Sequence, residues 1–189
     1  MSADTSTDSA RELARLLARL SYRSGSFRLA SGKQSDFYID VKQTVFTAAG
    51  AELVGRALCE RLAAHDITSV GGMAVGAVPL VTAALVEAAR RGYPLDGFFV
   101  RREVKDHGTS RRIDGLFDAS ARIALVEDVV TTGESTVQAI DAVEAAGGKV
   151  ALVVTVVDRQ EEGGLQNLAA RAGAAEALTS RASILEHAG

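Results

Sequence analysis

Residues 122–136 read RIALVEDVVTTGEST, in which an apolar run meets two acids and then a turn of threonines and glycine. We expect residues 123–126 to form a strand and residues 134–146 a helix that ends at the glycine pair 147–148. A strand and a helix joined by such a turn are typical of an open α/β sheet, whose ligands bind outside the carboxyl ends of the strands. The segment therefore predicts both a fold class and the place of a binding site.

The turn between this strand and helix has the composition of an anion site. Gly133 lets the backbone approach a ligand closely, and the start of the helix directs N–H groups and the positive end of the helix dipole at an anion. Thr131, Thr132 and Ser135 add hydroxyl donors. The segment is not a Walker loop, since no Gly-Lys-Ser/Thr follows, and it has no Gly-x-Gly-x-x-Gly fingerprint for a dinucleotide. It predicts a cup for one phosphate.

The adjacent acids Glu127 and Asp128 need a different partner, because two carboxylates would repel a bare phosphate. Sugar hydroxyls or magnesium-bound water are the natural partners of such a pair. A generic glycine turn alone would favour an ordinary helix start, whereas the whole arrangement favours a ligand site. A phosphate cup beside acids for vicinal hydroxyls describes a site for a phosphorylated ribose.

Apolar strands alternate with helices on both sides of this segment. We expect strands at residues 69–75, 98–102 and 150–157, and a helix at residues 79–91 that stops at Gly92. Strands that are apolar throughout and separated by helices predict a parallel sheet covered on both faces. Residues 103–115 are expected to be a charged loop, and residues 164–189 to add a helix, a short strand and an alanine-rich tail.

The N-terminal part has a different character. Residues 1–8 are expected to be a disordered leader, and leucines at helical spacing predict a helix from Ser9 to about residue 20. Residues 22–46 predict short strands joined by a turn at Ser31-Gly32, and Thr47 is placed to cap a helix over residues 48–64. We expect a single domain over residues 9–189, with residues 9–46 as a small appendage.

Composition narrows the class of protein. The 189 residues are 47% hydrophobic and 24% charged, a balance that argues against a disordered chain, and no stretch approaches the ~20 apolar residues of a membrane helix. A net charge of −3 argues against a nucleic-acid-binding domain. The polar N-terminus is not a signal peptide, and the single Cys59 cannot form an intramolecular disulfide. We expect a cytoplasmic protein that contacts neither membrane nor nucleic acid.

The strand, acid pair and turn together resemble the phosphoribosyl pyrophosphate (PRPP) motif of the type I phosphoribosyltransferases. The resemblance extends over nearly the whole chain and implies that family's parallel sheet flanked by helices, with a small N-terminal hood completed by the C-terminal region. It implies Mg2+ as cofactor, held mainly by the substrate and not by protein ligands. The PRPP-binding residues that it implies are Arg101, Arg102, Lys105, His107, Glu127, Asp128, Val129, Val130, Thr131, Thr132, Gly133, Glu134 and Ser135.

The charged segment FFVRREVKDHG, residues 98–108, crowds cations at the end of an apolar strand. A solvated loop is the ordinary reading of a charge run, but a cationic flap that closes over a polyanion would have this composition. It resembles the Arg-Lys-Glu-x-Lys-x-His-Gly loop of the orotate phosphoribosyltransferase family, with Arg102 where many members have lysine. The resemblance implies that Arg102, Lys105 and His107 are catalytic, and that a homodimer shares its active sites.

Two further segments are similar to the same family. FRLASGKQSDFYID, residues 27–40, is similar to the hood over the orotate base, and Arg159, at the end of the last long strand, matches the arginine that contacts orotate. An arginine at a strand end can pair with a carboxylate in bidentate fashion, and Thr131 is implied as a second orotate contact. Ala30 stands where many members have a lysine, and residues 71–79, GGMAVGAVP, lack the family's lysine as well.

The resemblance implies transfer of ribose 5-phosphate from PRPP to orotate, giving orotidine 5′-monophosphate and pyrophosphate in pyrimidine biosynthesis. One alternative is a purine phosphoribosyltransferase of the same fold. Arg159 argues against it, because an arginine can pair with the carboxylate of orotate, whereas purine bases are neutral. The other is a PRPP-sensing regulator without catalysis, which would be expected to carry a DNA-binding segment or a basic face and to lack the catalytic loop. Turnover with orotate, a purine base or neither separates the three.

Overall fold

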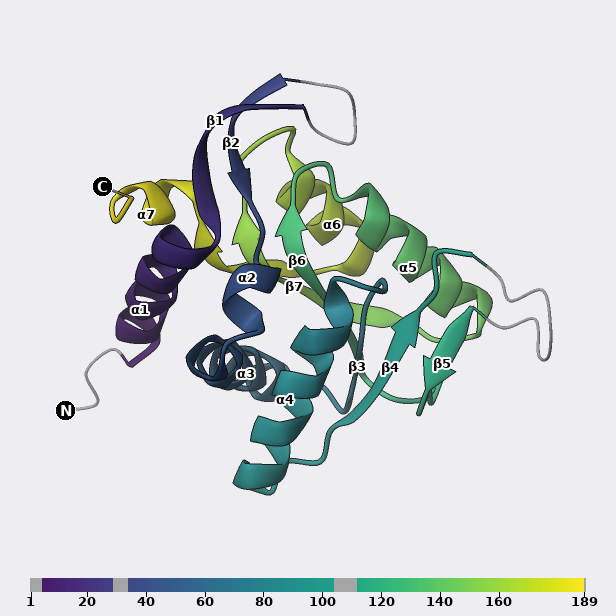
Figure 1. Ribbon diagram of the computed structural model, residues 1–189. Helices are drawn as coiled ribbons and strands as arrows, with labels where there is room; N and C mark the ends of the chain where they lie inside the picture. Colours follow the sequence, from purple (N-terminus) through teal and green to yellow (C-terminus); the bar gives the residue numbers. More distant parts are fainter. Residues whose placement is uncertain (1–4, 29–33, 104–111, 189) are drawn as a thin grey trace.

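The computed structural model describes residues 5–28, 34–103 and 112–188 (Figure 1). Within these ranges a six-stranded sheet has the order β5-β4-β3-β6-β7-β8, and its strands are parallel except for the antiparallel β5. The expected α/β class with a mainly parallel sheet is confirmed. The strands are β3 (Ser69–Gly71), β4 (Asp96–Val100), β5 (Ile113–Gly115), β6 (Ile123–Val130), β7 (Val150–Asp158) and β8 (Ala175–Ser180).

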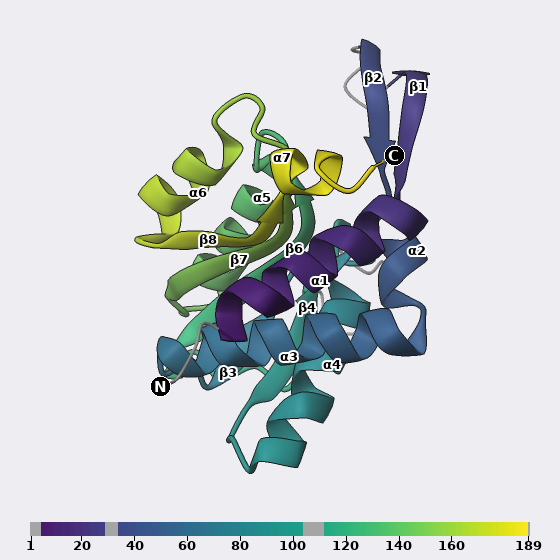
Figure 2. The same ribbon diagram turned by 90° about the vertical axis from the view of Figure 1, so that its left-hand side faces the viewer.

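The two faces of the sheet bury alternate residues of the central strands. On β6, Ala124 and Val126 belong to one apolar cluster, whereas Ile123 and Leu125 belong to the other. The first cluster includes leucines of α1 (Thr5–Leu20), α3 (Ala48–Ala64) and α4 (Ala77–Arg91); the second includes residues of α5 (Glu134–Ala145) and α6 (Gly164–Ala172). Figure 2 shows these two groups of helices on opposite sides of the strands. A parallel sheet with both faces covered has strands that are apolar throughout, as the sequence predicts.

Local signals set several helix ends. Thr47 caps α3 by accepting a hydrogen bond from the Gly50 N–H at 3.1 Å, and Gly92 ends α4 in the left-handed region at φ 64°. Helix α1 begins at Thr5, four residues before the expected start, so residues 5–8 of the expected leader are helical. Polar residues such as Asp8 are favourable in the first turns of a helix. None of the helices in the described ranges is long and apolar enough to cross a membrane.

The N-terminal strands form a separate antiparallel hairpin that projects from the sheet (Figure 2). We call β1 (Tyr22–Arg28) and β2 (Gln34–Ile39) the hairpin; its expected turn at Ser31-Gly32 lies outside the described residues. The prediction that residues 42–46 are part of a strand is wrong, because α2 (Lys42–Val45) forms there. The Asp40 carboxylate accepts from the Lys42 N–H at 3.2 Å, which stabilises a helical turn at this position.

Three more boundaries differ from those expected. Strand β3 ends at Gly71 instead of residue 75, because the chain turns there and enters α4 two residues earlier than expected. Strand β6 continues through both acids to Val130, since β7 runs beside it as far as Asp158. Within the expected loop, β5 pairs with β4, and within the expected tail, α7 (Arg181–Leu185) begins at a Ser180 cap.

Candidate active site

The turn after β6 exposes backbone donors at the carboxyl edge of the sheet. In the described part of the chain, the N–H groups of Thr131, Thr132 and Gly133 have no acceptor, and Gly133 lies at φ 82°. The Thr132 hydroxyl accepts from the Glu134 N–H at 3.3 Å, which fixes the start of α5. Gly164 of α6 packs so closely on the Thr131 carbonyl that no side chain would fit. The turn is therefore held in place with its donors available for an anion.

The two acids of β6 have different environments. Glu127 is only 8% exposed, and its Oε2 accepts from the Thr136 hydroxyl at 2.8 Å. Burial, and then the neighbouring Asp128, raise the pKa of Glu127 to about 8. At neutral pH Glu127 is thus mainly a neutral acid that can donate a hydrogen bond, whereas Asp128 is half-buried. The two adjacent acids therefore differ: Glu127 is a buried donor, and Asp128 is an acid with access to solvent.

Asp128 lies where three segments meet. The Lys42 ammonium is 3.6 Å from its Oδ2 and 2.7 Å from Oδ1 of Asp40. A side chain at Gly76 would begin 3.1 Å from the Asp128 carboxylate, so the chain between β3 and α4 passes close to this acid. The glycine-containing segment of residues 71–79, which lacks the family's lysine, is therefore beside the expected sugar site.

The cations expected on the flap differ in their contacts and in their exposure to solvent. Arg101 pairs with Asp114 of β5, and its guanidinium lies 5.2 Å from the centre of the Phe99 ring. Arg102 is exposed just after β4, and Arg112 donates to the carbonyl oxygen of Arg102 at 3.4 Å. Lys105 and His107 lie outside the described residues. Arg101 already has a carboxylate partner, while Arg102 faces solvent.

Arg159 is held tightly next to the turn. Its backbone N–H donates to the Val130 carbonyl at 3.1 Å, and its side chain is 5% exposed. Nε donates to Glu161 Oε2 at 3.0 Å, and a terminal nitrogen donates to the Ser35 hydroxyl at 3.2 Å. The guanidinium carbon lies 4.2 Å from the centre of the Phe37 ring on the hairpin. The structure thus brings the hairpin and Arg159 together, as the resemblance implies.

Sequence reasoning missed several of these contacts. Thr136 follows the expected motif by one residue, and its contact with Glu127 depends on how α5 packs against β6, which no local signal indicates. Lys42 and Glu161 belong to no motif of their own, although Glu161 stands only two residues after Arg159. Arg181 also contacts Phe37 and Glu161, and no local signal in the C-terminal region indicates it. We call Ser35, Phe37, Arg159, Glu161 and Arg181 the Arg159 cluster.

Comparison with known proteins gives a consistent result, although no family model matches the chain. An orotate phosphoribosyltransferase of Mycobacterium avium (strain 104) is 42% identical over 148 residues, 78% of this chain and 81% of that protein. One from Bradyrhizobium sp. (strain ORS 278) is 40% identical over 174 residues, 90% of this chain and 91% of that protein.

A solved structure extends the likeness to three dimensions. The crystal structure of Mycobacterium tuberculosis H37Rv orotate phosphoribosyltransferase in complex with PRPP is similar with a TM-score of 0.77 and 32% identity. The match covers 93% of this chain and 98% of that chain. The fold is therefore that of the type I phosphoribosyltransferases, as the turn after β6 indicates. With about 40% identity over most of two relatives and the same fold throughout, this chain belongs to the orotate phosphoribosyltransferase family.

Proposed function

We propose that this chain transfers the ribose 5-phosphate group of PRPP to orotate, giving orotidine 5′-monophosphate (OMP) and pyrophosphate. The observation that carries the proposal is the turn after β6, with free N–H groups and two acids, one strand away from the buried Arg159. This arrangement offers one site for a phosphorylated ribose and, beside it, one cation for an anionic base. A relative of the same fold was crystallised with PRPP.

In this proposal the turn binds the 5-phosphate of PRPP. The N–H groups of residues 131–133 and the start of α5 supply donors and the positive end of a helix dipole, while Thr131, Thr132 and Ser135 supply hydroxyls. Glu134 begins the helix, and Val129 and Val130 set the spacing between turn and acids. The ribose hydroxyls meet Asp128 as an acceptor and Glu127 as a donor.

Orotate binds between the turn and the Arg159 cluster. The substrate carboxylate pairs with Arg159, whose backbone is bonded to Val130 next to Thr131. Buried in a site with little solvent, a guanidinium favours an anionic base over a neutral one. This favours orotate over the purine bases, and we find no observation that favours a purine enzyme or a regulator without catalysis.

Catalysis consists mainly of stabilising the leaving pyrophosphate. As the bond from ribose C1 to pyrophosphate breaks, negative charge accumulates on the diphosphate and positive charge on the sugar. Arg102, just after β4, together with Lys105 and His107, supplies cations to the leaving group. The chain between β3 and α4 lies beside the end of β4, where the Ala74 N–H donates to the Val100 carbonyl at 2.8 Å. Closure over the site would also exclude water that could hydrolyse PRPP.

Mg2+ fits this site as a metal carried by the substrate. The described residues contain no group of three or more His, Cys, Asp or Glu side chains that could hold a metal ion. Asp128 is the acid there with access to solvent, so it is placed to accept from metal-bound water. When bound to the diphosphate and ribose hydroxyls, the metal would neutralise charge on the leaving group.

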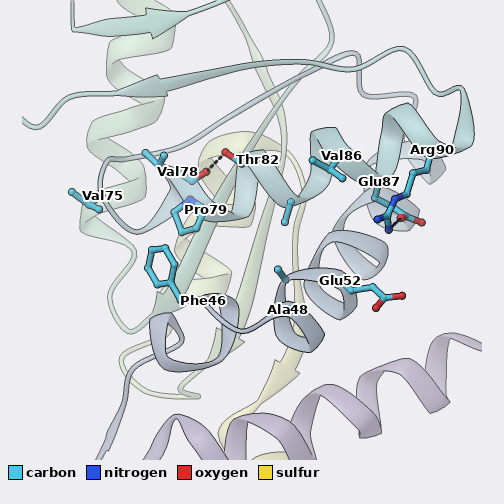
Figure 3. A pocket seen from close by; sticks show the side chains of 12 residues that line it. Phe46, Ala48, Glu52, Val75, Val78, Pro79, Thr82, Val86, Glu87 and Arg90 are labelled. Atoms are coloured by element: carbon cyan, nitrogen blue, oxygen red, sulfur yellow. Dashed lines mark hydrogen bonds and ion pairs between the residues drawn. The ribbon is translucent and has the colours of Figure 1, made fainter.

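A homodimer belongs to the same proposal, and one exposed face supports it. Phe46, Val75 and Val86 are 73%, 72% and 50% exposed, and they line an apolar groove of about 620 Å3 between α3 and α4 (Figure 3). Val75 belongs to the segment that approaches Asp128, so a second copy seated here would reach the edge of the active site. In analytical ultracentrifugation, Phe46→Asp should convert a dimer into a monomer. An unchanged sedimentation coefficient would show that this face is not the dimer interface.

The experiment that tests the reaction is an assay of the purified protein with PRPP, Mg2+ and orotate. Loss of orotate absorbance is followed, while adenine, hypoxanthine and uracil are assayed in parallel for pyrophosphate release. We expect turnover with orotate alone. Turnover with another base would support the PRPP site but show that Arg159 does not select the base. PRPP binding without any turnover would favour a regulator.

Cytoplasmic localisation stays a prediction, which fractionation of the source cells would test.

A further inference from the structure

Arg181 is the residue whose position this function does not explain. It opens α7, directly after β8, and lies 22 positions after Arg159 in the sequence. Figure 2 shows α7 on the side of the sheet from which the hairpin projects. Its guanidinium carbon is 3.9 Å from the centre of the Phe37 ring, the same ring that Arg159 contacts at 4.2 Å. Two arginines from distant segments therefore stack on one phenyl ring, which is 1% exposed.

Glu161 joins the same two arginines. Its Oε2 accepts from Nε of Arg159 at 3.0 Å, and its Oε1 is 3.5 Å from a terminal nitrogen of Arg181. The other terminal nitrogen of Arg181 is 3.5 Å from the carboxylate of Asp36 on the hairpin. Asp36 stands between Ser35 and Phe37, the two hairpin residues that contact Arg159. Arg181 thus contacts the carboxylate and the ring that orient Arg159, and also the strand that carries both hairpin contacts.

This arrangement has an electrostatic cost that a purely structural contact would avoid. Two guanidinium groups beside one ring repel each other, and each is stabilised by the ring face and by Glu161. The Nε of Arg181 is buried and has no hydrogen-bond partner among the described residues. Nε and one terminal nitrogen of Arg159 are engaged by Glu161 and Ser35, so in the described part of the chain its other terminal nitrogen is the one left for a ligand.

We propose that Arg181 is a positioning residue for recognition of the substrate carboxylate. It acts through Phe37 and Glu161, which it holds in the geometry that orients the guanidinium of Arg159. Its own positive charge also balances Glu161, so that Glu161 does not neutralise Arg159 alone. The inference rests on the proposed role of Arg159 in orotate binding, and it makes Arg181 a determinant of specificity for an anionic base.

The test compares two nucleotides that differ only in the carboxylate. OMP carries it and uridine 5′-monophosphate (UMP) lacks it, so calorimetric titration of both measures carboxylate recognition separately from binding of ribose and phosphate. In Arg181→Gln we expect OMP to bind roughly tenfold more weakly, because small displacements of a positioned group can cost up to ~100-fold, and UMP to bind as before. An equal loss for both nucleotides, or no loss for either, would overturn the proposal in favour of a structural role.

Two further variants keep the result interpretable. Arg181→Lys retains the charge but not the flat group that stacks on Phe37, so it should show a smaller loss that is still confined to OMP; it also serves if Arg181→Gln does not fold. Arg171→Gln is the matched control, since Arg171 pairs with Asp141 and Glu144 away from this cluster, and it should leave both affinities unchanged.

Arg159→Gln separates the failure of this inference from failure of the proposed function. A loss confined to OMP in Arg159→Gln, together with unchanged OMP binding in Arg181→Gln, would overturn only the role of Arg181. Equal binding of OMP by the wild-type chain and Arg159→Gln would overturn the orotate site itself, and the role of Arg181 with it.

Discussion

The phosphate turn and the Arg159 cluster lie at the same edge of the sheet, but the chain builds them in different ways. The turn and its acids are continuous, within residues 127–136, and need one strand, one turn and one helix. The Arg159 cluster combines residues of β2, the end of β7 and the start of α7. Changes in the turn should therefore affect PRPP through local geometry, whereas changes in any of three distant segments should affect orotate.

The largest effect is expected from Gly133→Ala. Gly133 lies at φ 82°, and a Cβ there would be 2.9 Å from the Leu168 side chain, so the turn must move. We expect the KM for PRPP to rise about 100-fold in steady-state kinetics, since the N–H groups would lose their alignment. Gly147→Ala is the control: it has a similar φ of 87°, but its Cβ would meet only Ala119, at 3.8 Å. An equal change in both variants would show that backbone strain, and not the turn, is responsible.

The next effect is expected from Arg159→Ala, which tests the other side of the comparison. Removing a buried guanidinium leaves the substrate carboxylate without its cation, and leaves Glu161 with Arg181 alone. The KM for orotate should rise at least ~30-fold, while the KM for PRPP should change little. Kinetics at saturating PRPP measure this, and an unchanged KM for orotate would remove Arg159 from the base site.

A smaller effect is expected from Ser35→Ala on the hairpin. This substitution removes one hydrogen bond to Arg159, at 3.2 Å, and the hydroxyl's bond to the Phe37 carbonyl, at 2.8 Å, while the pairing of Arg159 with Glu161 stays. We expect about a fivefold rise in the KM for orotate, in keeping with one hydrogen bond to a charged group. Ser26→Ala is the matched control, because among the described residues the Ser26 hydroxyl on β1 bonds to Gln34 and not to Arg159. If both serine variants behave alike, the hairpin does not act through Arg159.

The smallest effect is expected from Glu127→Gln, measured as stability against pH. The folded-state pKa of Glu127, about 8, is above the usual 4.5, so folding favours the protonated acid, and the wild-type chain loses stability as pH rises from about 4.5 through 8. A glutamine can still accept from Thr136 and does not titrate. The melting temperatures of wild type and variant should be similar at pH 5, and the variant should be higher by at least ~3 °C at pH 8. A difference that does not change with pH would show that Glu127 does not titrate in this range.

Much of the sheet could be predicted from the sequence, because its signals are local. Apolar runs indicated β6 and β7, Thr47 indicated the start of α3, and Gly92 indicated the end of α4. Two of the predictions that failed concern partners distant in the sequence. Strand β6 continues to Val130 because β7 pairs with it as far as Asp158. Residues 113–115 form β5 because they pair with β4.

The candidate site divides in the same way. Consecutive residues determined the phosphate turn, because a strand, a glycine at positive φ and a helix start are local properties of the chain. Tertiary structure alone decided that Glu127 is buried against Thr136 while Asp128 meets Lys42, because burial and ion pairs depend on neighbours that periodicity does not reveal. It also brought Arg181 to Phe37 and Glu161, since only the folded sheet places the start of α7 beside the hairpin.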